Sequence, residues 1–331
     1  MERTTLGRTG RTVSAIGLGT WQLGSDWGDV SDADARAVLD AAYAAGVTFF
    51  DTADVYGDGK SEQTIGAWLA ANPDSGVTVA TKMGRRMDQL PENYVLDNFR
   101  QWTDRSRANL GVDTLDLVQL HCPPTAVYST AAVYDALDTL VADGAIANYG
   151  VSVETVDEGL EALKHPGVAS IQIILNAFRL KPLDALVPAA AEAGVGIIAR
   201  VPLASGLLSG RYGVTTTFAA NDHRTYNRHG EAFDQGETFS GVDYAQGVAA
   251  AQEFAALVRD TAGDTLTPAQ AALAWIWQQS GVSTVIPGAR NPEQARLNAA
   301  AGSAAPLGNA FNAGVVDLYN RYFREAIHGR W

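Results

Sequence analysis

The stretch Gly196-Ile197-Ile198-Ala199-Arg200-Val201 is apolar along almost its whole length and follows a helical pattern over Asp184–Ala193. A strand with one face in water alternates apolar and polar residues, whereas a strand covered on both faces is a continuous apolar run. Gly194 lies where the preceding helix would end. The stretch therefore predicts a parallel strand that is covered by helices.

The same alternation of helix and apolar run recurs along the chain. Seven further runs predict strands at Ala15–Gly19, Thr48–Asp51, Val77–Lys82, Leu115–His121, Ile146–Ser152, Ser170–Asn176 and Thr284–Pro287. The other helical patterns lie at Asp32–Ala45, Ser61–Ala71, Pro91–Leu110, Ser129–Asp143, Glu154–Lys164, Pro268–Gln279 and Pro292–Ala301. Eight strands that alternate with helices predict an α/β fold, a closed (β/α)8 TIM barrel, as a single domain over residues 1–331.

Three segments lie outside these repeats. Residues 4–13 predict an N-terminal hairpin, and residues 306–331 predict a helical tail. Residues 210–262 form a long insertion after the seventh strand, with a polar loop followed by a helical pattern from Ala245. Long loops of this kind are often functional. The predicted helix caps are Ser31, Ser61 and Ser129 at N-termini, and Gly46, Gly111, Gly144 and Gly194 at C-terminal ends.

Composition narrows the possible partners. The 331 residues include 24 Lys and Arg against 37 Asp and Glu, a net charge of −13, and no block of basic residues offsets it locally. Such a surface repels nucleic acids and anionic membranes, so we expect neither as a partner. The single cysteine excludes an intrachain disulfide framework and a multi-cysteine metal site. With no signal-like start and no membrane-length apolar run, we expect a cytoplasmic protein, a monomer or small homo-oligomer.

Four polar residues gather where the predicted strands end. Asp51, Lys82 and His121 end strands two, three and four, and Tyr56 follows Asp51 by five residues. The C-terminal ends of the strands carry the active sites of such barrels. A lysine cation beside a tyrosine favours the phenolate and lowers the tyrosine pKa, and a carboxylate holds the lysine charged. This group suits protonation of a carbonyl oxygen during hydride addition, which indicates carbonyl reduction.

Six segments together resemble the aldo-keto reductase superfamily, over nearly the whole chain. They are Gly17-Leu18-Gly19-Thr20-Trp21, Phe50-Asp51-Thr52-Ala53-Asp54-Val55-Tyr56-Gly57, Ala80-Thr81-Lys82, Gln119-Leu120-His121, Gly150-Val151-Ser152 and Ile286-Pro287-Gly288-Ala289-Arg290. The intervals of 5, 26 and 39 residues resemble the family's Asp–Tyr–Lys–His tetrad. The resemblance implies that Tyr56 is the general acid, that Lys82 and Asp51 tune it, and that His121 orients the substrate. It also implies that the hairpin plugs the bottom of the barrel.

The resemblance further implies NAD(P)H bound across the rim without a Rossmann domain, with NADPH expected and NADH possible. The residues at matching cofactor positions are Gly19, Thr20, Trp21, Asp51, Ser152, Gln172, Arg200, Val201, Pro202, Leu203, Ser205, Gly206, Leu208, Gly288, Arg290, Gln294 and Asn298. Arg290 is the expected ligand of the adenosine 2′-phosphate, because a guanidinium forks onto phosphate oxygens.

Three positions depart from the family pattern. Val153 stands where many members have an asparagine, so one carboxamide contact is missing or comes from elsewhere, with Asn176 as a candidate. Gly288 replaces a lysine that is frequent in the family, a departure that bears on NADP preference and not on cofactor use. Arg200 replaces a tyrosine that stacks on the nicotinamide. A cation there disfavours the oxidised ring, so Arg200 is predicted to favour the reduced cofactor.

The substrate pocket is predicted from Trp21, Val55, Met83 and Cys122, with contributions from the insertion and the tail. The Trp21 side chain either contacts a flat or apolar carbonyl substrate or packs against the end of the first strand. Within the insertion, the polar residues either select a sugar or anionic aldehyde or only order the loop; they are His223, Arg224, Asn227 and Arg228.

Three other classes of protein were weighed against this interpretation. A Rossmann dehydrogenase needs a third glycine after Gly17-Leu18-Gly19, and position 22 is Gln22. A metal-dependent barrel hydrolase needs clustered ligands that five histidines, mostly late in the chain, do not provide, so no metal is expected. The remaining alternative is an NADPH-binding, redox-sensing regulatory subunit with little turnover, which the tetrad does not exclude.

Overall fold

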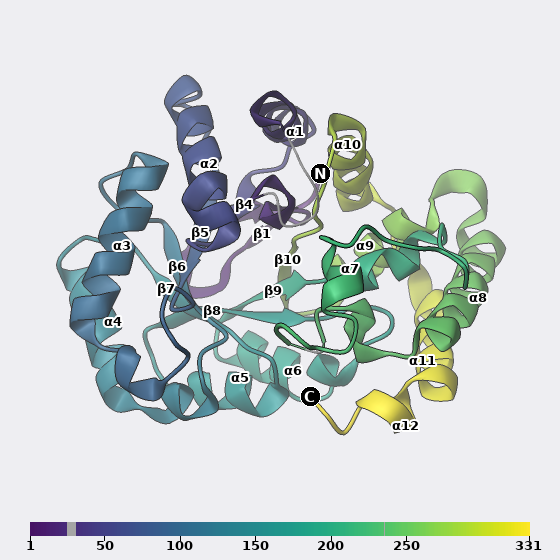
Figure 1. Cartoon of the computed structure of the whole chain (residues 1–331). Coiled ribbons are helices and arrows are strands. Elements are labelled where there is room, and N and C mark those ends of the chain that lie inside the picture. The colour runs from purple at the N-terminus through teal and green to yellow at the C-terminus, as the bar shows by residue number, and fades with distance from the viewer. Residues whose placement is uncertain (25–30, 235) are drawn as a thin grey trace.

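The computed structural model describes residues 1–24, 31–234 and 236–331. Eight parallel strands form one sheet in the order β10-β9-β8-β7-β6-β5-β4-β3. They are β3 (Leu18–Gly19), β4 (Phe49–Asp51), β5 (Thr78–Met83), β6 (Leu117–His121), β7 (Tyr149–Ser152), β8 (Val168–Ile174), β9 (Gly196–Arg200) and β10 (Val282–Val285). Parallel bridges from Ile16 to Val285 and from Gly19 to Gly288 join the two edges. The predicted (β/α)8 barrel is therefore confirmed (Figure 1).

Helices surround the sheet on its outer side (Figure 1). They are α1 (Asp32–Ala44), α2 (Lys60–Ala71), α3 (Leu96–Leu110), α4 (Ala131–Ala142), α5 (Val156–Ala162), α6 (Leu186–Glu192), α9 (Pro268–Trp277) and α10 (Pro292–Ala300). Helix α1 packs on α10, which brings the first and last repeats side by side. The large apolar core lies between this ring of helices and the strands.

Some predicted element boundaries differ from those of the structure. The helix predicted over Pro91–Leu110 is a 3-10 turn at Pro91–Asn93 followed by α3, because Tyr94 leaves helical geometry and packs on Phe99 and Trp102. Pairing in the last strand begins two residues earlier than predicted, at Val282.

The predicted caps have mixed outcomes. Ser31 accepts a hydrogen bond from Asp34 N, as an N-cap does, and the four glycines after helices have left-handed geometry. Ser61 is not a cap, because α2 begins at Lys60 and the buried Ser61 hydroxyl contacts Thr20 Oγ1 at 2.8 Å instead. Ser129 is not a cap either, because Thr130 holds the N-cap position of α4.

The hairpin closes the N-terminal end of the barrel. Strands β1 (Arg3–Thr5) and β2 (Thr12–Ser14) pair antiparallel around a 3-10 turn. Leu6 and Val13 complete a small core inside the barrel with Phe49, Ala80, Leu117, Ile198 and Ile286. A Cβ on Gly7 would lie 2.1 Å from Gly196 N, so only glycine permits this close approach.

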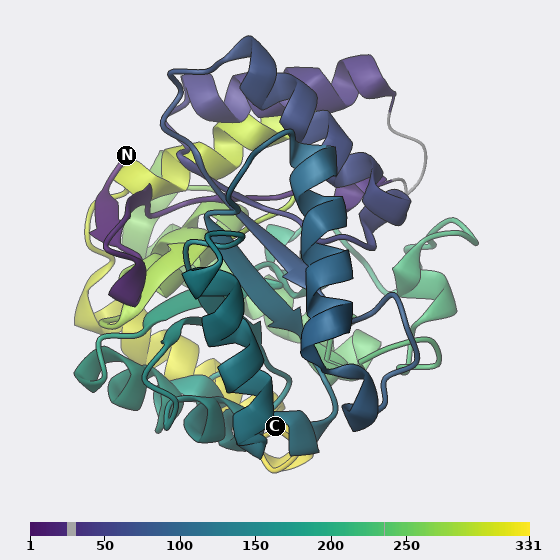
Figure 2. The same cartoon turned by 90° about the vertical axis from the view of Figure 1, so that its left-hand side faces the viewer.

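The insertion and the tail lie on one side of the barrel. After β9 come a 3-10 segment at Ala204–Ser209, the short helix α7 (His223–Tyr226) and the long helix α8 (Tyr244–Ala262). The tail forms α11 (Gly308–Tyr322) and α12 (Arg324–Ile327), and α11 packs along α8. Figure 2 shows the part of the insertion around α7 projecting beside the strand ends, away from the hairpin.

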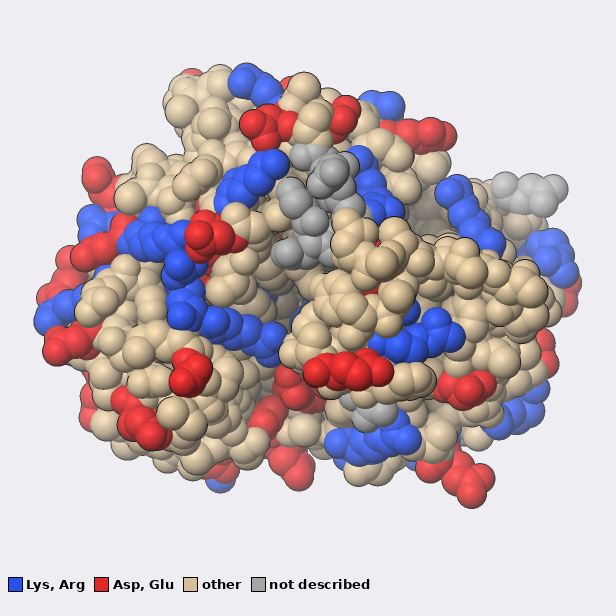
Figure 3. Space-filling model, viewed as in Figure 1, with Lys and Arg blue, Asp and Glu red and all other residues tan. Residues whose placement is uncertain are grey.

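On the face in Figure 3, basic and acidic side chains are interleaved over the left half. Within the described ranges, no helix combines the length and the apolar character that a membrane span requires.

Candidate active site

Three of the four predicted tetrad residues, Asp51, Lys82 and His121, lie on the neighbouring strands β4, β5 and β6. The fourth, Tyr56, lies in the loop after β4. Lys82 Nζ donates to Asp51 Oδ1 at 2.5 Å and to the Thr52 carbonyl at 2.8 Å. Its distance to the Tyr56 hydroxyl is 3.4 Å. The register of β4 and β5 places Asp51 opposite Ala80, two residues before Lys82, so both side chains emerge at the same rim. The structure therefore brings the predicted acid, cation and carboxylate together.

The charges of this group follow from its burial. Burial favours the neutral amine of Lys82, but Asp51 and Tyr56 outweigh it, and the pKa of Lys82 lies above its ordinary value of 10.5. Burial also raises the pKa of Tyr56 above 10.0, although Lys82 acts in the opposite direction. The sequence-based expectation of a lowered tyrosine pKa is thus wrong in this structure, because removing water from the phenol outweighs the nearby cation. At neutral pH the site holds a lysine cation and a protonated tyrosine.

His121 is neutral at the same rim. Burial and the cations of Arg85, Lys82 and Arg200 lower the pKa of His121 well below 6.5. Its ring lies edge-on to Tyr56, with centroids 5.9 Å apart. Within the described residues, Nδ1 is buried without a hydrogen-bond partner. A neutral imidazole beside a protonated phenol offers hydrogen bonds to one oxygen atom between them.

Two buried carboxamides support Asp51 from beneath. Gln172 Nε2 donates to Asp51 Oδ2 at 2.8 Å, and Gln119 Nε2 donates to the same oxygen at 3.2 Å. Gln172 was predicted at the cofactor site, but Gln119 was not singled out. It could have been found, because side chains alternate along a strand and Gln119 shares a face with His121.

Asp54 is a buried carboxyl group directly behind the rim. Its side chain is inaccessible to water, and within the described residues neither oxygen has a hydrogen-bond partner. Burial and the nearby Glu62 raise the pKa of Asp54 to about 8. Asp54 is therefore mostly protonated at neutral pH.

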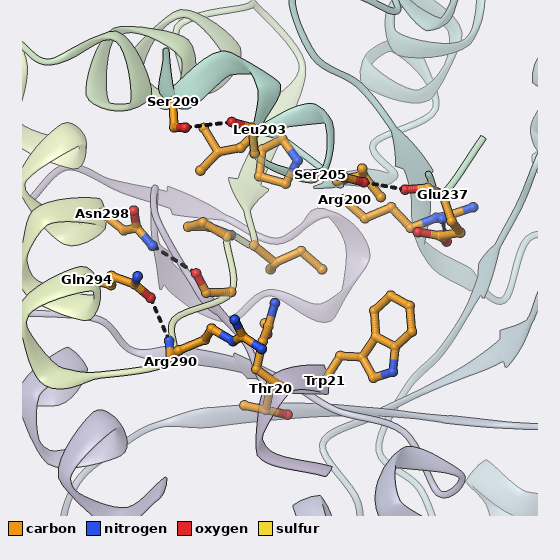
Figure 4. A pocket seen from close by; sticks show the side chains of 18 of the residues that line it. Thr20, Trp21, Arg200, Leu203, Ser205, Ser209, Glu237, Arg290, Gln294 and Asn298 are labelled. Atoms are coloured by element: carbon orange, nitrogen blue, oxygen red, sulfur yellow. Dashed lines mark hydrogen bonds and ion pairs between the residues drawn. The ribbon is translucent and has the colours of Figure 1, made fainter. Parts of the chain in front are cut away.

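A pocket of about 730 Å3 opens over this rim. Most of the predicted site residues line it: Gly19, Thr20, Trp21, Asp51, Val55, Tyr56, His121, Gln172, Arg200, Val201, Pro202, Leu203, Ser205, Gly206, Gly288, Arg290, Gln294 and Asn298. Figure 4 shows Arg200 and Glu237 on one wall and Gln294 and Asn298 on the opposite one. The lining residues that sequence reasoning missed include Gln22, Arg85, Tyr226, Phe233 and Glu237. Most of these lie in loops, where no periodic pattern indicates which side chains face inward.

Five predicted residues lie outside the lining. Lys82 is buried beneath it, and Leu208 is buried in the apolar core. Met83 was predicted to line the substrate pocket, but its buried sulfur lies against Thr103 of α3 on the outer side of the strand. Ser152 and Cys122 contact each other behind the pocket, with Cys122 Sγ 3.3 Å from Ser152 Oγ.

Gly288, Arg290, Gln294 and Asn298 line the pocket wall distant from Tyr56 (Figure 4). Gln294 Oε1 accepts from Arg290 N at 2.8 Å, and Asn298 Nδ2 donates to the Gly288 carbonyl at 3.1 Å. A Cβ at Gly288 would lie 2.1–2.3 Å from the Gln22 carboxamide, so a larger residue there requires the Gln22 side chain to move. Gln22 Oε1 is buried with no hydrogen-bond partner in the part of the chain described. Gln22 occupies the space that a longer side chain at position 288 would need.

Arg200 is paired rather than isolated. It forms an ion pair with Glu237, and its guanidinium donates to the Val153 carbonyl at 3.3 Å. The prediction that Arg200 favours a reduced cofactor treated it as an unpaired cation, and the structure removes that premise. Asn176 is also unavailable as the missing carboxamide ligand, because its amide donates to Val201 O and Ser240 Oγ.

The polar residues of the insertion bind mainly to the insertion itself. Asp222 forms two hydrogen bonds to the Arg224 guanidinium, and Arg228 stacks on Tyr244. Asn227 is fully buried and accepts hydrogen bonds from Ala232 N and Phe233 N. These contacts order the loop, and Arg224 also reaches the pocket. Among the described residues, no three histidine, cysteine or acidic side chains are placed to hold a metal ion.

Comparison with known proteins places this geometry in a family. Residues 15–319 match the model of the aldo/keto reductase family. An uncharacterized oxidoreductase of Mycobacterium tuberculosis is 34% identical over 297 residues, which cover 87% of this chain and 84% of that protein.

Two further similar proteins have assigned names. D-threo-aldose 1-dehydrogenase of a Pseudomonas species is 31% identical over 229 residues, 60% of this chain and 69% of that protein. The solved structure of a glycerol dehydrogenase from Gluconobacter oxydans superposes with a TM-score of 0.76 at 27% identity, and covers 95% of this chain and 93% of that one.

Proposed function

Because the chain belongs to the aldo/keto reductase family and is an oxidoreductase of that type, we propose that it interconverts a carbonyl compound and its alcohol with NADPH as the reductant. The observation that carries this proposal is the Tyr56 hydroxyl beside Lys82, protonated and open to the pocket. When bound, the reduced nicotinamide supplies a hydride to the carbonyl carbon.

The residues of the rim have separate tasks in this proposal. Tyr56 gives its proton to the carbonyl oxygen as negative charge develops there, and the Lys82 cation stabilises the phenolate that remains. Asp51 keeps Lys82 charged and oriented through its hydrogen bond. Neutral His121 positions the carbonyl oxygen beside the Tyr56 hydroxyl, because both residues line the pocket and their rings lie in edge-on contact. In alcohol oxidation the same proton returns to Tyr56.

The residues present fit a phosphorylated dinucleotide. Arg290 is exposed at the pocket, and no ion pair holds its guanidinium within the described residues, so it is available for the 2′-phosphate. The N-terminus of α10 lies on that side, and its dipole favours an anion there, although Pro292 has no N–H and Gln294 N already donates to Asn291 Oδ1. Gln22 Oε1 and Gln294 would hold the adenosine. Gln172 and Arg200 lie near Tyr56, where the nicotinamide must reach the substrate.

The pocket wall beside Tyr56 favours a hydroxylated substrate. Trp21 stacks near Tyr56 with centroids 6.0 Å apart, and Phe233 meets Trp21 edge-on at 5.7 Å. Arg85 and Glu237 add charged groups to the same lining. Aromatic faces with hydrogen-bonding groups between them suit sugars and other polyols, which is the substrate class named for the Pseudomonas and Gluconobacter proteins.

Turnover tests the proposal directly. We expect NADPH consumption, followed by its absorbance at 340 nm, with aldoses and short hydroxyaldehydes, and slower consumption with NADH. Aromatic aldehydes serve as the comparison for an apolar pocket. Tight NADPH binding without turnover of any carbonyl would overturn the proposal and favour the redox-sensing regulatory subunit.

The Tyr56→Phe variant tests the acid. We expect kcat to fall by about 10²–10⁴-fold, the usual contribution of general acid catalysis, while the dissociation constant of NADPH changes little. Phenylalanine at the exposed Tyr43 is the matched control. Substantial activity of the Tyr56→Phe variant would exclude Tyr56 as the proton donor.

A further inference from the structure

Arg200 ends β9 and presents a buried guanidinium to the pocket near Tyr56. Its side chain is only 8% exposed, so its charge is poorly screened by water. Two carboxylates meet it. Glu237 forms the ion pair described above, and Asp234 Oδ2 lies 3.9 Å from the guanidinium. Both come from the insertion, not from the barrel.

The backbone holds Glu237 in this position. Ser205 Oγ donates to the Glu237 carbonyl at 2.7 Å (Figure 4), and Ser205 itself lies in the pocket wall after β9. Glu237 N donates to the Asp234 carbonyl at 3.2 Å, so both acidic residues belong to one turn. The Glu237 side chain remains 19% exposed and lines the pocket. The backbone of Glu237 is thus held at the pocket wall, and its carboxylate contacts the Arg200 cation.

This placement matters because oxidised and reduced nicotinamide differ by one positive charge. An unpaired cation close to the ring raises the energy of the oxidised form alone, and the effect is large where water is excluded. A carboxylate on the same cation cancels most of that field. The local charge balance therefore decides which oxidation state binds more tightly.

We propose that Glu237, acting through Arg200, sets the relative affinity for the oxidised and reduced cofactor, and that it keeps the oxidised form bound well enough for alcohol oxidation. This inference rests on the proposed function, since it requires the nicotinamide to lie beside Arg200. Glu237 is a positioning residue in this proposal and transfers no proton. In this proposal, a residue of the insertion thereby sets the relative affinity of the pocket for the oxidised and the reduced cofactor.

The test measures binding rather than turnover. Tryptophan fluorescence titrations give dissociation constants for NADP+ and NADPH, or for NAD+ and NADH if the wild type binds that pair more tightly. For Glu237→Gln we expect the ratio of the oxidised to the reduced constant to rise about tenfold, the size of a partly screened charge interaction at several ångströms. Arg200→Gln should lower the ratio. The double variant, which restores the wild-type net charge of this group, should return the ratio close to the wild-type value.

Glu231→Gln is the matched control, because it removes the same charge from the same insertion at an exposed site outside the pocket lining. Its ratio should equal the wild-type ratio. If Glu237→Gln leaves the ratio unchanged, or if Glu231→Gln shifts it equally, the inference is wrong while the proposed function stands. If the wild type binds neither cofactor pair, the proposed function itself fails.

Discussion

The barrel rim and the insertion over it form the same pocket by different physical means. In the rim, Asp51, Lys82 and His121 stand on strands whose backbone ladders fix them. In the insertion, Phe233 and Glu237 lie in a loop held by side chains such as Asn227. Many backbone hydrogen bonds between neighbouring strands hold the rim residues in place, whereas the loop depends on a few buried polar side chains. We therefore expect the two regions to have different roles. The rim holds the residues that transfer the proton, and the insertion determines which ligands fit the pocket.

Loss of the rim cation should have the largest effect. In Lys82→Met, Asp51 keeps a buried carboxylate without its ion-pair partner, and Tyr56 loses the charge that stabilises its phenolate. Removing one member of a buried pair lowers the free energy of unfolding by about 3–5 kcal/mol. We expect kcat to fall by at least about 10²-fold as well. Chemical denaturation and steady-state kinetics measure the two effects.

The Lys164→Met variant is the control for this change, because Lys164 pairs with Glu161 on an exposed helix end. Its stability should change by no more than about 1 kcal/mol. A Lys82→Met enzyme with nearly normal kcat would show that the rim does not depend on its cation, and the contrast with the insertion would disappear.

A single change in the insertion should have an intermediate effect, and of another kind. Asn227→Ala removes the acceptor of Ala232 N and Phe233 N, and each buried amide left without a partner costs about 1–3 kcal/mol. Because Phe233 lines the pocket, we expect the substrate KM to rise several-fold, while kcat, which the rim determines, falls less. The exposed Asn320, which accepts a hydrogen bond from Arg324, provides an Asn→Ala control. An equal loss in kcat with constant KM would place the insertion in the chemical step.

Substitution of Asp54, directly behind the rim, should have a smaller effect. Its pKa is about 8 in the folded chain and 3.8 ordinarily, so between these values the folded state binds more protons than the unfolded state. Stability then falls as pH rises from about 4 to 8. Asp54→Asn abolishes this slope. The free energy of unfolding of the variant, relative to that of the wild type, should therefore rise from pH 5 to pH 8 by an amount on the order of 1–3 kcal/mol, and the difference in Tm measures this trend. Asp74→Asn, at an exposed site, should show a constant difference.

The same contrast explains how much the sequence could reveal. Asp51, Lys82 and His121 were predictable because continuous apolar runs mark buried parallel strands, and the ends of such strands meet at one rim. Glu237 was not, because its partner Arg200 lies 37 positions earlier and no period links a loop carboxylate to a strand cation. The cap predicted at Ser61 and the pocket position predicted for Met83 differ from the structure for a related reason. A local pattern indicates a cap or a strand end, but tertiary packing decides which way the side chain points.

The smallest expected effect is the pH dependence of kcat. A nearly constant kcat would indicate that no group of the tetrad titrates near neutral pH. Burial keeps the Tyr56 pKa above 10.0 and the His121 pKa well below 6.5, so neither group titrates between pH 6.5 and 9. Carbonyl reduction needs the protonated phenol, and kcat should therefore stay constant within about twofold over this range and fall only at higher pH. Alcohol oxidation needs the phenolate, so its rate should rise with pH. An inflection near neutral pH in the wild type that Asp54→Asn abolished would show that the carboxyl behind the rim, not the tetrad, controls the proton transfer.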